Sequence, residues 1–313
     1  VKVRQMKHEL RLVRNFTEAT AITHSGVFHA DEVFATVLLC NMHPVKLFRT
    51  ASVTSEDSSF HQTVYDIGGG KYDHHQKTFN DCRASGTKYS SFGLMWKECG
   101  IWYMSHEVNT CKNPELAAEI FDREFVEGID AIDNGQIIKH VDEVSITSVS
   151  NIISMMNPLW NKSEEDENDC FEKAVKVANV IFNRAIESAV SKAEAKDIVE
   201  AAIERSNDHI MILDFFVPWQ SYLLNSENPK AADILYVLFT SKRSGFNVQA
   251  VPDAPGSFGM RKMLPKAWAG LNKEELVKVT GVESAIFCHN ARFICGAEKY
   301  NDALELAKLA VND

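Results

Sequence analysis

The chain has 313 residues, more than one hydrophobic core usually organises, so its length predicts two domains. Its hydrophobic fraction of 45% is enough for buried cores, and no apolar run approaches the roughly 20 residues of a transmembrane helix, which excludes an integral membrane protein. A formal net charge of −10 argues against binding of duplex DNA through phosphate contacts, although carboxylates that hold metal ions lower this charge without repelling a phosphate substrate.

The first half of the chain alternates strand-like and helix-like stretches. Short apolar runs bounded by turn residues predict strands, and apolar residues at helical spacing predict helices. In chain order we expect a strand at 21–23, a helix at 31–41, strands at 45–50 and 63–67, and helices at 90–99 and 114–133. Asn113 and Pro114 fit the cap and first residue of the last helix. This alternation predicts an α/β domain with a mainly parallel sheet.

A long helical pattern separates the two halves of the chain. Residues 170–205 are amphipathic and contain no Gly or Pro, so they predict one or two linking helices. Beyond residue 207 we expect strands at 210–213, 234–239, 246–251, 285–288 and 292–295, and then a final helix capped by Asn301. The domain boundary is expected near residue 190, inside the helical connection.

The cysteines and the first residues of the chain indicate the cellular compartment of the protein. Seven cysteines are scattered without a C-x-x-C pair, which is typical of reduced thiols in a reducing compartment. Residues 1–7 are basic but lack the apolar stretch of a secretory signal. We therefore expect an intracellular protein, first of all cytoplasmic, with the mitochondrion or nucleus as alternatives in a eukaryotic cell. The sequence does not determine the oligomeric state.

Histidines and aspartates gather where predicted strands end and helices begin. His24 ends the first strand, and His29 and Asp31 lie in the turn before the first helix. Asp66 ends the third strand, and an Asp-His-His triplet at 73–75 follows a glycine-rich turn. Taken singly, such a His is more often a structural residue and such an Asp an N-cap. Because ligands of open α/β sheets gather at the carboxyl ends of strands, the four segments together predict one site.

This mixture of imidazole and carboxylate groups points to metal chemistry. Such a set suits transition-metal ions, so Mn²⁺ is expected ahead of Mg²⁺. Two ions about 3.5–4 Å apart can hold a phosphate and activate water for in-line attack. A carboxylate between two metals is the usual bridge, and Asp66, central in the set, is the candidate. The residues therefore predict a phosphodiesterase that uses two metal ions.

Two motifs carry a resemblance to a known family. Residues 23–32 (THSGVFHADE) and 64–76 (VYDIGGGKYDHHQ) resemble the melanocyte proliferating gene protein family of the DHH phosphoesterase superfamily. Further similar blocks lie at 125–135, 156–161, 217–219, 249–252, 264–271 and 287–289. The resemblance covers nearly the whole chain from residue 21 onward. It implies an N-terminal DHH domain with a mainly parallel sheet at 18–190, and a smaller α/β substrate-binding domain with the helical connection at 191–313.

The resemblance also implies an activity and a ligand set. The implied activity is that of a divalent-metal-dependent 3′–5′ exoribonuclease on single-stranded RNA or a short oligonucleotide. One of two metal ions takes His24, His29 and Asp66. The other takes Asp31, Asp66, His74 and an acidic residue of a fourth motif, either Asp130 or Asp133. Asp133 is favoured, because Asp133-Asn134-Gly135 is similar to the Asp-x-Gly of the superfamily.

The sequence differs from the superfamily at one ligand position, and the resemblance also implies roles for several further residues. His29 stands where most of the superfamily has Asp, and this neutral, softer ligand favours Mn²⁺ or Zn²⁺ over Mg²⁺. The resemblance places His75 near the substrate phosphate, as hydrogen-bond donor or leaving-group acid, so His75 and Asp66 are the catalytic candidates. In the second domain, the loop at 289–296 corresponds to a phosphate-binding loop. The candidates for substrate binding are His289, Arg292, Arg261 and Lys266.

Two other functions stay open from the sequence. The same metal cluster would cleave small phosphoanhydrides or cyclic dinucleotides, for which a compact closed pocket is expected. An open groove with aromatic platforms such as Trp268 would instead favour a nucleic-acid strand. The second alternative is a non-catalytic RNA- or partner-binding protein of the same fold, which would not need an intact ligand set.

Overall fold

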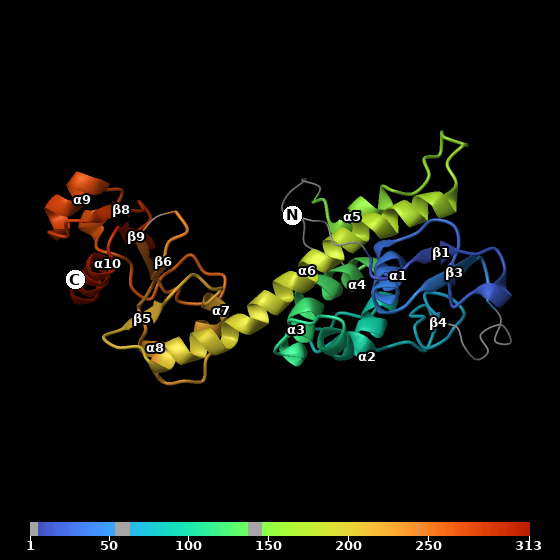
Figure 1. Ribbon diagram of the computed structural model, residues 1–313, viewed down its shortest axis with the longest axis horizontal. Coiled ribbons are helices and arrows are strands. Elements are labelled where there is room, and N and C mark those ends of the chain that lie inside the picture. The colour runs from blue at the N-terminus through green and yellow to red at the C-terminus, as the bar shows by residue number, and fades with distance from the viewer. Residues whose placement is uncertain (1–5, 54–62, 137–145, 244) are drawn as a thin grey trace. The chain divides into compact units, whose positions relative to one another are not determined.

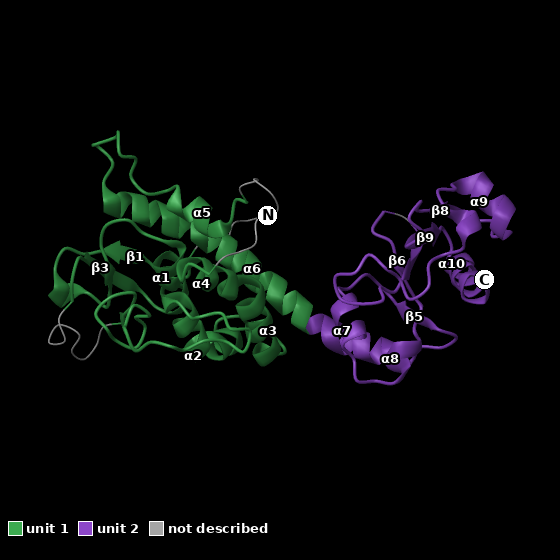
Figure 2. Cartoon of the chain, turned by 180° about the vertical axis from the view of Figure 1, so that it is seen from behind, with its two compact units in different colours: residues 1–193 green, residues 194–313 purple. Residues whose placement is uncertain are grey.

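The computed structural model describes residues 6–53, 63–136, 146–243 and 245–313 (Figure 1). The chain divides into two compact units, residues 1–193 and residues 194–313 (Figure 2). Each unit combines helices with a sheet of its own, so the α/β fold class expected from the sequence is confirmed. The basic start of the chain, apart from its last two residues, lies outside the described residues.

Unit 1 contains a four-stranded sheet in the order β1-β3-β2-β4. The strands are β1 (Leu10–Leu12), β2 (Ala21–His24), β3 (Val45–Thr50) and β4 (Thr63–Val64). All neighbouring pairs are parallel. The carboxyl ends of β2 and β4 therefore meet at one edge of the sheet, where the predicted ligands were expected. β1 was not predicted, because three residues are too few to show an alternating pattern.

The helix α1 (Ala30–Met42) lies at the centre of unit 1. Its residues 30–41 are all buried, which is typical of a helix surrounded by other elements rather than one at the surface. It contacts α2 (Ser91–His106), α4 (Glu127–Asp133) and α5 (Val149–Ser154). The start of α1 is therefore enclosed by elements from distant parts of the chain.

The helix predicted at 114–133 forms, but it is not uniform. Asn113 caps it as expected, since its side chain accepts a hydrogen bond of 3.2 Å from the Leu116 N–H. A π-helical turn at Asp122–Val126 then separates α3 (Pro114–Phe121) from α4. Such wide turns are frequent near functional sites, because they change the direction of the side chains that follow.

The long connection is a single helix, α6 (Glu167–Glu204), of 38 residues. Its first part belongs to unit 1, where Phe171 and Phe182 join the core, and its last part belongs to unit 2, where Val199 and Ile203 are buried. Charged residues recur along its whole length. Within the described ranges, no helix combines the length and the apolar character needed to cross a membrane.

Unit 2 contains a five-stranded sheet in the order β5-β6-β7-β9-β8. The strands are β5 (Ile210–Leu213), β6 (Tyr236–Thr240), β7 (Phe246–Ala250), β8 (Ala285–Cys288) and β9 (Ile294–Ala297). β5 and β6 are parallel, and the other pairs are antiparallel. The remaining helices are α7 (Gln220–Leu224), α8 (Lys230–Asp233), α9 (Lys273–Thr280) and α10 (Tyr300–Asn312).

Several bounds predicted from the sequence were wrong in detail. The helix expected at 90–99 is α2, which ends at residue 106, and the strand expected at 234–239 is β6, which begins at residue 236. The final helix begins at Tyr300 with Lys299 at its cap, so Asn301 lies within its first turn. β9 begins at residue 294 rather than 292, because Arg292 has a left-handed φ of 56° in the turn after β8. The third strand ends at Val64 rather than 67, and Asp66 beyond it has a left-handed φ of 58°.

Candidate metal centre

The first candidate ligand lies where β2 ends. The Nδ1 atom of His24 is 3.0 Å from the Ser25 carbonyl oxygen, to which it donates. The other ring nitrogen, Nε2, lies 2.8 Å from Glu32 Oε1 and 3.3 Å from Asp66 Oδ2. Burial lowers the pKa of His24, but its hydrogen bonds to the two carboxylates outweigh this effect and raise the pKa to about 11. The imidazole therefore occupies a strongly negative environment.

The N-terminus of α1 adds His29 and Glu32. The backbone N–H of His29 donates to Glu32 Oε1 at 2.8 Å, while Glu32 Oε2 is buried and has no hydrogen-bond partner. Ligand atoms of His24, His29 and Glu32 lie within 4.8 Å of one another. Sequence reasoning missed Glu32, because a Glu three residues after a helix cap fits the ordinary capping box. An unpartnered buried carboxylate oxygen is costly unless a cation or a donor satisfies it.

Asp66 lies between the two parts of the site. Its Oδ2 faces His24, and its Oδ1 lies 3.2 Å from His74 Nε2. Its backbone N–H donates to the Tyr72 carbonyl, which holds the left-handed conformation in place. Burial raises the pKa of Asp66, but the close imidazoles of His24 and His74 outweigh burial and hold this pKa below its usual range. Asp66 therefore lies between His24 and His74 and remains the candidate for the bridge.

The three residues of the Asp-His-His triplet have different surroundings. Asp73 is buried and accepts a hydrogen bond from the His75 backbone N–H, so it organises the turn. His74 points inward, with Nε2 between Asp66 and Asp133. The His75 side chain is 62% exposed, and its Nδ1 lies 3.1 Å from Asp73 Oδ1 and 3.4 Å from Asp66 Oδ1. The second His is thus the accessible one.

The end of α4 distinguishes the two fourth-motif candidates. Asp133 Oδ2 lies 3.0 Å from His74 Nε2. Asp130, one turn earlier, is fully buried and accepts from Arg83 Nη1 at 2.7 Å. Its other oxygen lies 2.5 Å from Ser90 Oγ. We therefore take Asp133, and not Asp130, into the proposed ligand set.

Asp31 is positioned by the start of α2. Its carboxylate accepts from the backbone N–H groups of Ser91, at 3.0 Å, and Phe92, at 2.6 Å. Ser90 Oγ lies 2.5 Å from both Asp31 Oδ1 and Asp130 Oδ1. The Ser90 hydroxyl has one hydrogen and can donate to only one of the two carboxyl groups. The other carboxyl group completes the second contact if it is protonated and donates to Ser90 Oγ. Burial raises the pKa of Asp130 to about 7, and burial with nearby carboxylates raises that of Asp31.

The complete cluster is rich in negative charge and in metal-binding atoms. It contains four acidic residues, Asp31, Glu32, Asp66 and Asp133, and among the described residues none of them pairs with a lysine or arginine. Two further triads have ligand atoms within 4.8 Å of one another: Asp66, His74 and His75, and Asp31, His74 and Asp133. The buried Nε2 of His74 lies 3.2 Å from Asp66 Oδ1 and 3.0 Å from Asp133 Oδ2 but forms no well-aligned hydrogen bond with either. Concentrated carboxylates with imidazoles and unsatisfied atoms fit divalent cations.

Unit 2 carries the four residues predicted to bind substrate. His289 and Arg292 lie in the turn between β8 and β9, where Arg292 N–H donates to the His289 carbonyl at 2.8 Å. The Arg292 guanidinium donates to the Leu264 carbonyl at 3.2 Å, which connects this turn to the segment before Lys266. His289 and Lys266 are exposed. These three residues remain candidates for contacts with a ligand.

Two expectations for unit 2 are corrected by the structure. Arg261 Nη1 donates to the carbonyl groups of Ala231, at 2.6 Å, and Ile234, at 2.9 Å, so it caps the end of α8. We therefore do not retain Arg261 as a substrate-binding residue. Trp268, suggested as an aromatic platform, is 5% exposed and packs in the core, so its ring offers no stacking surface.

Comparison with known proteins agrees with the motifs at 23–32 and 64–76. The family model MYG1_exonuc, described as uncharacterised protein family UPF0160, matches residues 20–311. A MYG1 protein of Schizosaccharomyces pombe is 33% identical, over 93% of this chain and 96% of its own length. The MYG1 exonucleases of Rattus norvegicus and Homo sapiens are 30% and 29% identical, each over 91% of this chain and over 83% and 84% of their own lengths. No solved structure matches. The chain belongs to the MYG1 family.

Proposed function

We propose that this chain is a phosphodiesterase that uses two divalent metal ions to remove nucleotides from the 3′ end of short single-stranded RNA. The observation that carries this proposal is the convergence of four carboxylates and the inward-facing His24 and His74 in unit 1. The rat and human relatives are named exonucleases, which supports a nuclease. The 3′–5′ direction and the preference for RNA follow from the resemblance of the motifs.

The proposed ligand sets are those implied by the resemblance, extended by one residue that the geometry of the cluster adds. One ion would take His24, His29 and Asp66, with Glu32 added to the set expected from the sequence. The other would take Asp31, Asp66, His74 and Asp133. Four carboxylates balance the four positive charges of two divalent ions. When bound, the ions would activate water and stabilise the negative charge on the phosphate.

The proposed role of His75 is to protonate the leaving oxygen. Its hydrogen bond to Asp73 raises its pKa, which favours the protonated ring near neutral pH. This bond engages Nδ1, so Nε2 of the exposed ring is available to donate. Asp73 thereby orients the acid, and His75 delivers the proton at the position where the substrate would enter.

A comparison of three substrates tests this function. The chain, stripped of metal by a chelator, is supplied with Mn²⁺ and offered 5′-labelled RNA, the same DNA sequence and pyrophosphate. We expect no turnover without metal and, with metal, a ladder of RNA products shortened from the 3′ end. Faster cleavage of pyrophosphate would favour a small-molecule hydrolase. RNA binding without cleavage in any metal would favour a non-catalytic protein.

A matched pair of variants locates the activity. Asp66→Asn should remove turnover, because a neutral amide cannot hold two cations close together. Asp81→Asn makes the same chemical change outside the cluster, at a surface carboxylate 2.6 Å from Lys97, and should leave turnover unchanged. Activity of Asp66→Asn within tenfold of the wild type would reject Asp66 as the bridge.

A further inference from the structure

The sheet of unit 2 has a face that is only partly covered. On one side, Val248 and Cys295 belong to a core that includes α10. On the other side, Val237 of β6 packs with residues of α6, α7 and α8. Over β7, β9 and β8 this second side instead presents partly exposed side chains, namely Asn247, Gln249, Ile294, Ile286 and Phe287. We call this part of the sheet the β7–β9–β8 face.

Strand register places an aromatic ring beside an amide on this face. Gly296 pairs with Asn247 on one side and with Phe287 on the other. A Cβ atom added to Gly296 would lie 3.0 Å from Phe287 Cε1 and 3.2 Å from Asn247 Oδ1. The ring and the amide therefore lie close together over the glycine backbone. Gln249, two residues along β7, points to the same side.

A cavity of about 600 Å³ lies over this face, within the usual size range of ligand sites. The rings of Phe216, Phe287 and Phe293 line it together with the side chains of Lys242 and Arg243. Phe216 is 45% exposed, and Lys242 Nζ lies 5.9 Å from the centre of its ring. Among the described residues that line the cavity there is no Asp or Glu. This is notable in a chain with a net charge of −10.

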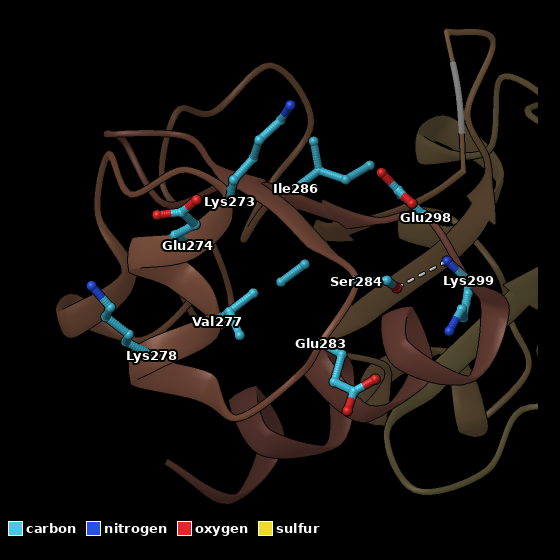
Figure 3. Close-up of a pocket in the computed structure, with 10 residues that line it drawn as sticks. Lys273, Glu274, Val277, Lys278, Glu283, Ser284, Ile286, Glu298 and Lys299 are labelled. Atoms are coloured by element: carbon cyan, nitrogen blue, oxygen red, sulfur yellow. Dashed lines mark hydrogen bonds between the residues drawn. The ribbon is translucent and has the colours of Figure 1, made fainter.

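A second cavity in unit 2 has a different character. It has a volume of about 680 Å³ and lies beside α9. Figure 3 shows its charged side chains, three lysines and three glutamates: Lys273, Lys278, Lys299, Glu274, Glu283 and Glu298. The charges balance, and no aromatic ring is among the described residues that line it. A basic, aromatic lining therefore distinguishes the cavity over the β7–β9–β8 face from the cavity beside α9.

We infer that the β7–β9–β8 face binds the unpaired bases of a single-stranded RNA. This inference rests on the proposed function and names a surface through which unit 2 holds the substrate. Phenylalanine rings stack on bases of any sequence, and amides hydrogen-bond to base edges. Lys242 and Arg243 neutralise the phosphates of the same strand. Because no Asp or Glu is among the described residues that line the cavity, no carboxylate of that lining repels the phosphates.

The inference is tested by RNA binding in the absence of hydrolysis. The full chain in chelator is titrated against a fluorescent single-stranded RNA of about twelve nucleotides, within the range of strand-binding sites, and anisotropy is measured. The double variant Phe216→Leu/Phe287→Leu keeps apolar side chains but removes two rings. We expect it to bind at least about tenfold more weakly, because loss of base stacking has effects of this size. A duplex of equal length should also bind more weakly, because its bases are already paired.

Salt dependence tests the role of the two cations. Each phosphate neutralised on a single strand adds about 0.7 to the slope of log affinity against log salt, so Lys242→Ala/Arg243→Ala should reduce this slope by roughly 1.4. The matched control Lys278→Ala/Lys299→Ala removes two cations from the charge-balanced cavity in Figure 3 and should leave the slope unchanged. Equal slopes for the two double variants would overturn the inference.

Hydrolysis of bis(p-nitrophenyl) phosphate separates this inference from the proposed function. This small diester reaches a metal centre without a strand-binding surface, so its hydrolysis by the wild type in Mn²⁺ reports on the metal centre alone. No hydrolysis by the wild type would reject the proposed function, while the binding titration still decides the inference. The inference would be overturned if Phe216→Leu/Phe287→Leu bound RNA with wild-type affinity, or if the wild type bound the duplex as tightly as the single strand. If that variant fails to fold, Gln249→Ala removes only an amide and must weaken RNA binding.

Discussion

Replacement of Gly93 by Ala tests the packing that supports the metal centre. Gly93 lies in the first turn of α2, and its N–H donates to Asp130 Oδ1 at 3.1 Å. A Cβ atom at this position would lie 2.6 Å from Asp130 Cγ, closer than real Cβ contacts. Asp130 is held in place by Arg83 and Ser90, so it cannot move without losing its partners.

Two effects of opposite sign determine the result. Alanine in place of glycine inside a helix stabilises by at most about 1 kcal/mol. Overpacking costs about 1–3 kcal/mol, and breaking a buried ion pair such as Arg83 with Asp130 costs about 3–5 kcal/mol. The steric effect is the larger one. We therefore expect Gly93→Ala to destabilise unit 1 by about 2–5 kcal/mol.

Hydrogen exchange on peptides from α2 measures this change in unit 1 alone. Gly128→Ala is the matched control, because Gly128 is also helical and a Cβ atom there meets nothing within 4 Å. Exchange should become faster in Gly93→Ala and slower in Gly128→Ala. The opposite signs separate helix propensity from packing.

A double variant checks the cause. Asp130→Ala removes the carboxylate that the new Cβ atom would meet. Gly93→Ala combined with Asp130→Ala should therefore cost about 1–3 kcal/mol less than the sum of the single changes. If the costs of the two single changes simply add, or if exchange is slower in Gly93→Ala, contact of the new Cβ atom with Asp130 is not the cause of the destabilisation.

Further predictions concern the ligands themselves. His74→Ala should lose one bound ion, whereas His75→Ala should keep both and slow the chemical step; elemental analysis decides, and ion loss in His75→Ala would reverse the two roles. The wild type should hydrolyse RNA faster in Mn²⁺ than in Mg²⁺, and His29→Asp should narrow that difference by adding a hard anionic ligand. A metal titration in which the ratio of the rates in Mn²⁺ and Mg²⁺ is unchanged in His29→Asp argues against His29 as a ligand. Glu32→Gln should weaken Mn²⁺ binding, measured by titration calorimetry, because it removes the negative charge of a side chain whose Oε2 has no hydrogen-bond partner. Unchanged Mn²⁺ affinity would exclude Glu32 from the site.

The place where the candidate residues lie in the fold could be predicted from the sequence. His24 and Asp66 follow strands whose apolar patterns are readable, and parallel strands bring their carboxyl ends together. The left-handed backbone of Asp66 could not be predicted, because aspartate visits this conformation only occasionally and the sequence does not mark which aspartate does so. Glu32 was hidden for another reason. Its sequence position is equally typical of an ordinary helix start.

The supporting contacts could not be predicted, because they join residues far apart in the chain. Arg83 precedes Asp130 by 47 positions, and Ser90 joins Asp130 to Asp31 only after α2 and α4 have packed against α1. The same limit explains Arg261. A basic residue near a turn looks like a phosphate contact in sequence, but here its guanidinium is used by the carbonyl groups of α8.

The number of bound ions tests the central claim most directly. The full chain is dialysed to equilibrium against Mn²⁺, and its metal content is measured by elemental analysis alongside Asp66→Asn, with circular dichroism as the check on folding. The proposed ligand sets predict two ions per chain in the wild type and at most one in the variant. One ion or none in the wild type, or two in a folded Asp66→Asn, would contradict a pair of metal ions bridged by Asp66.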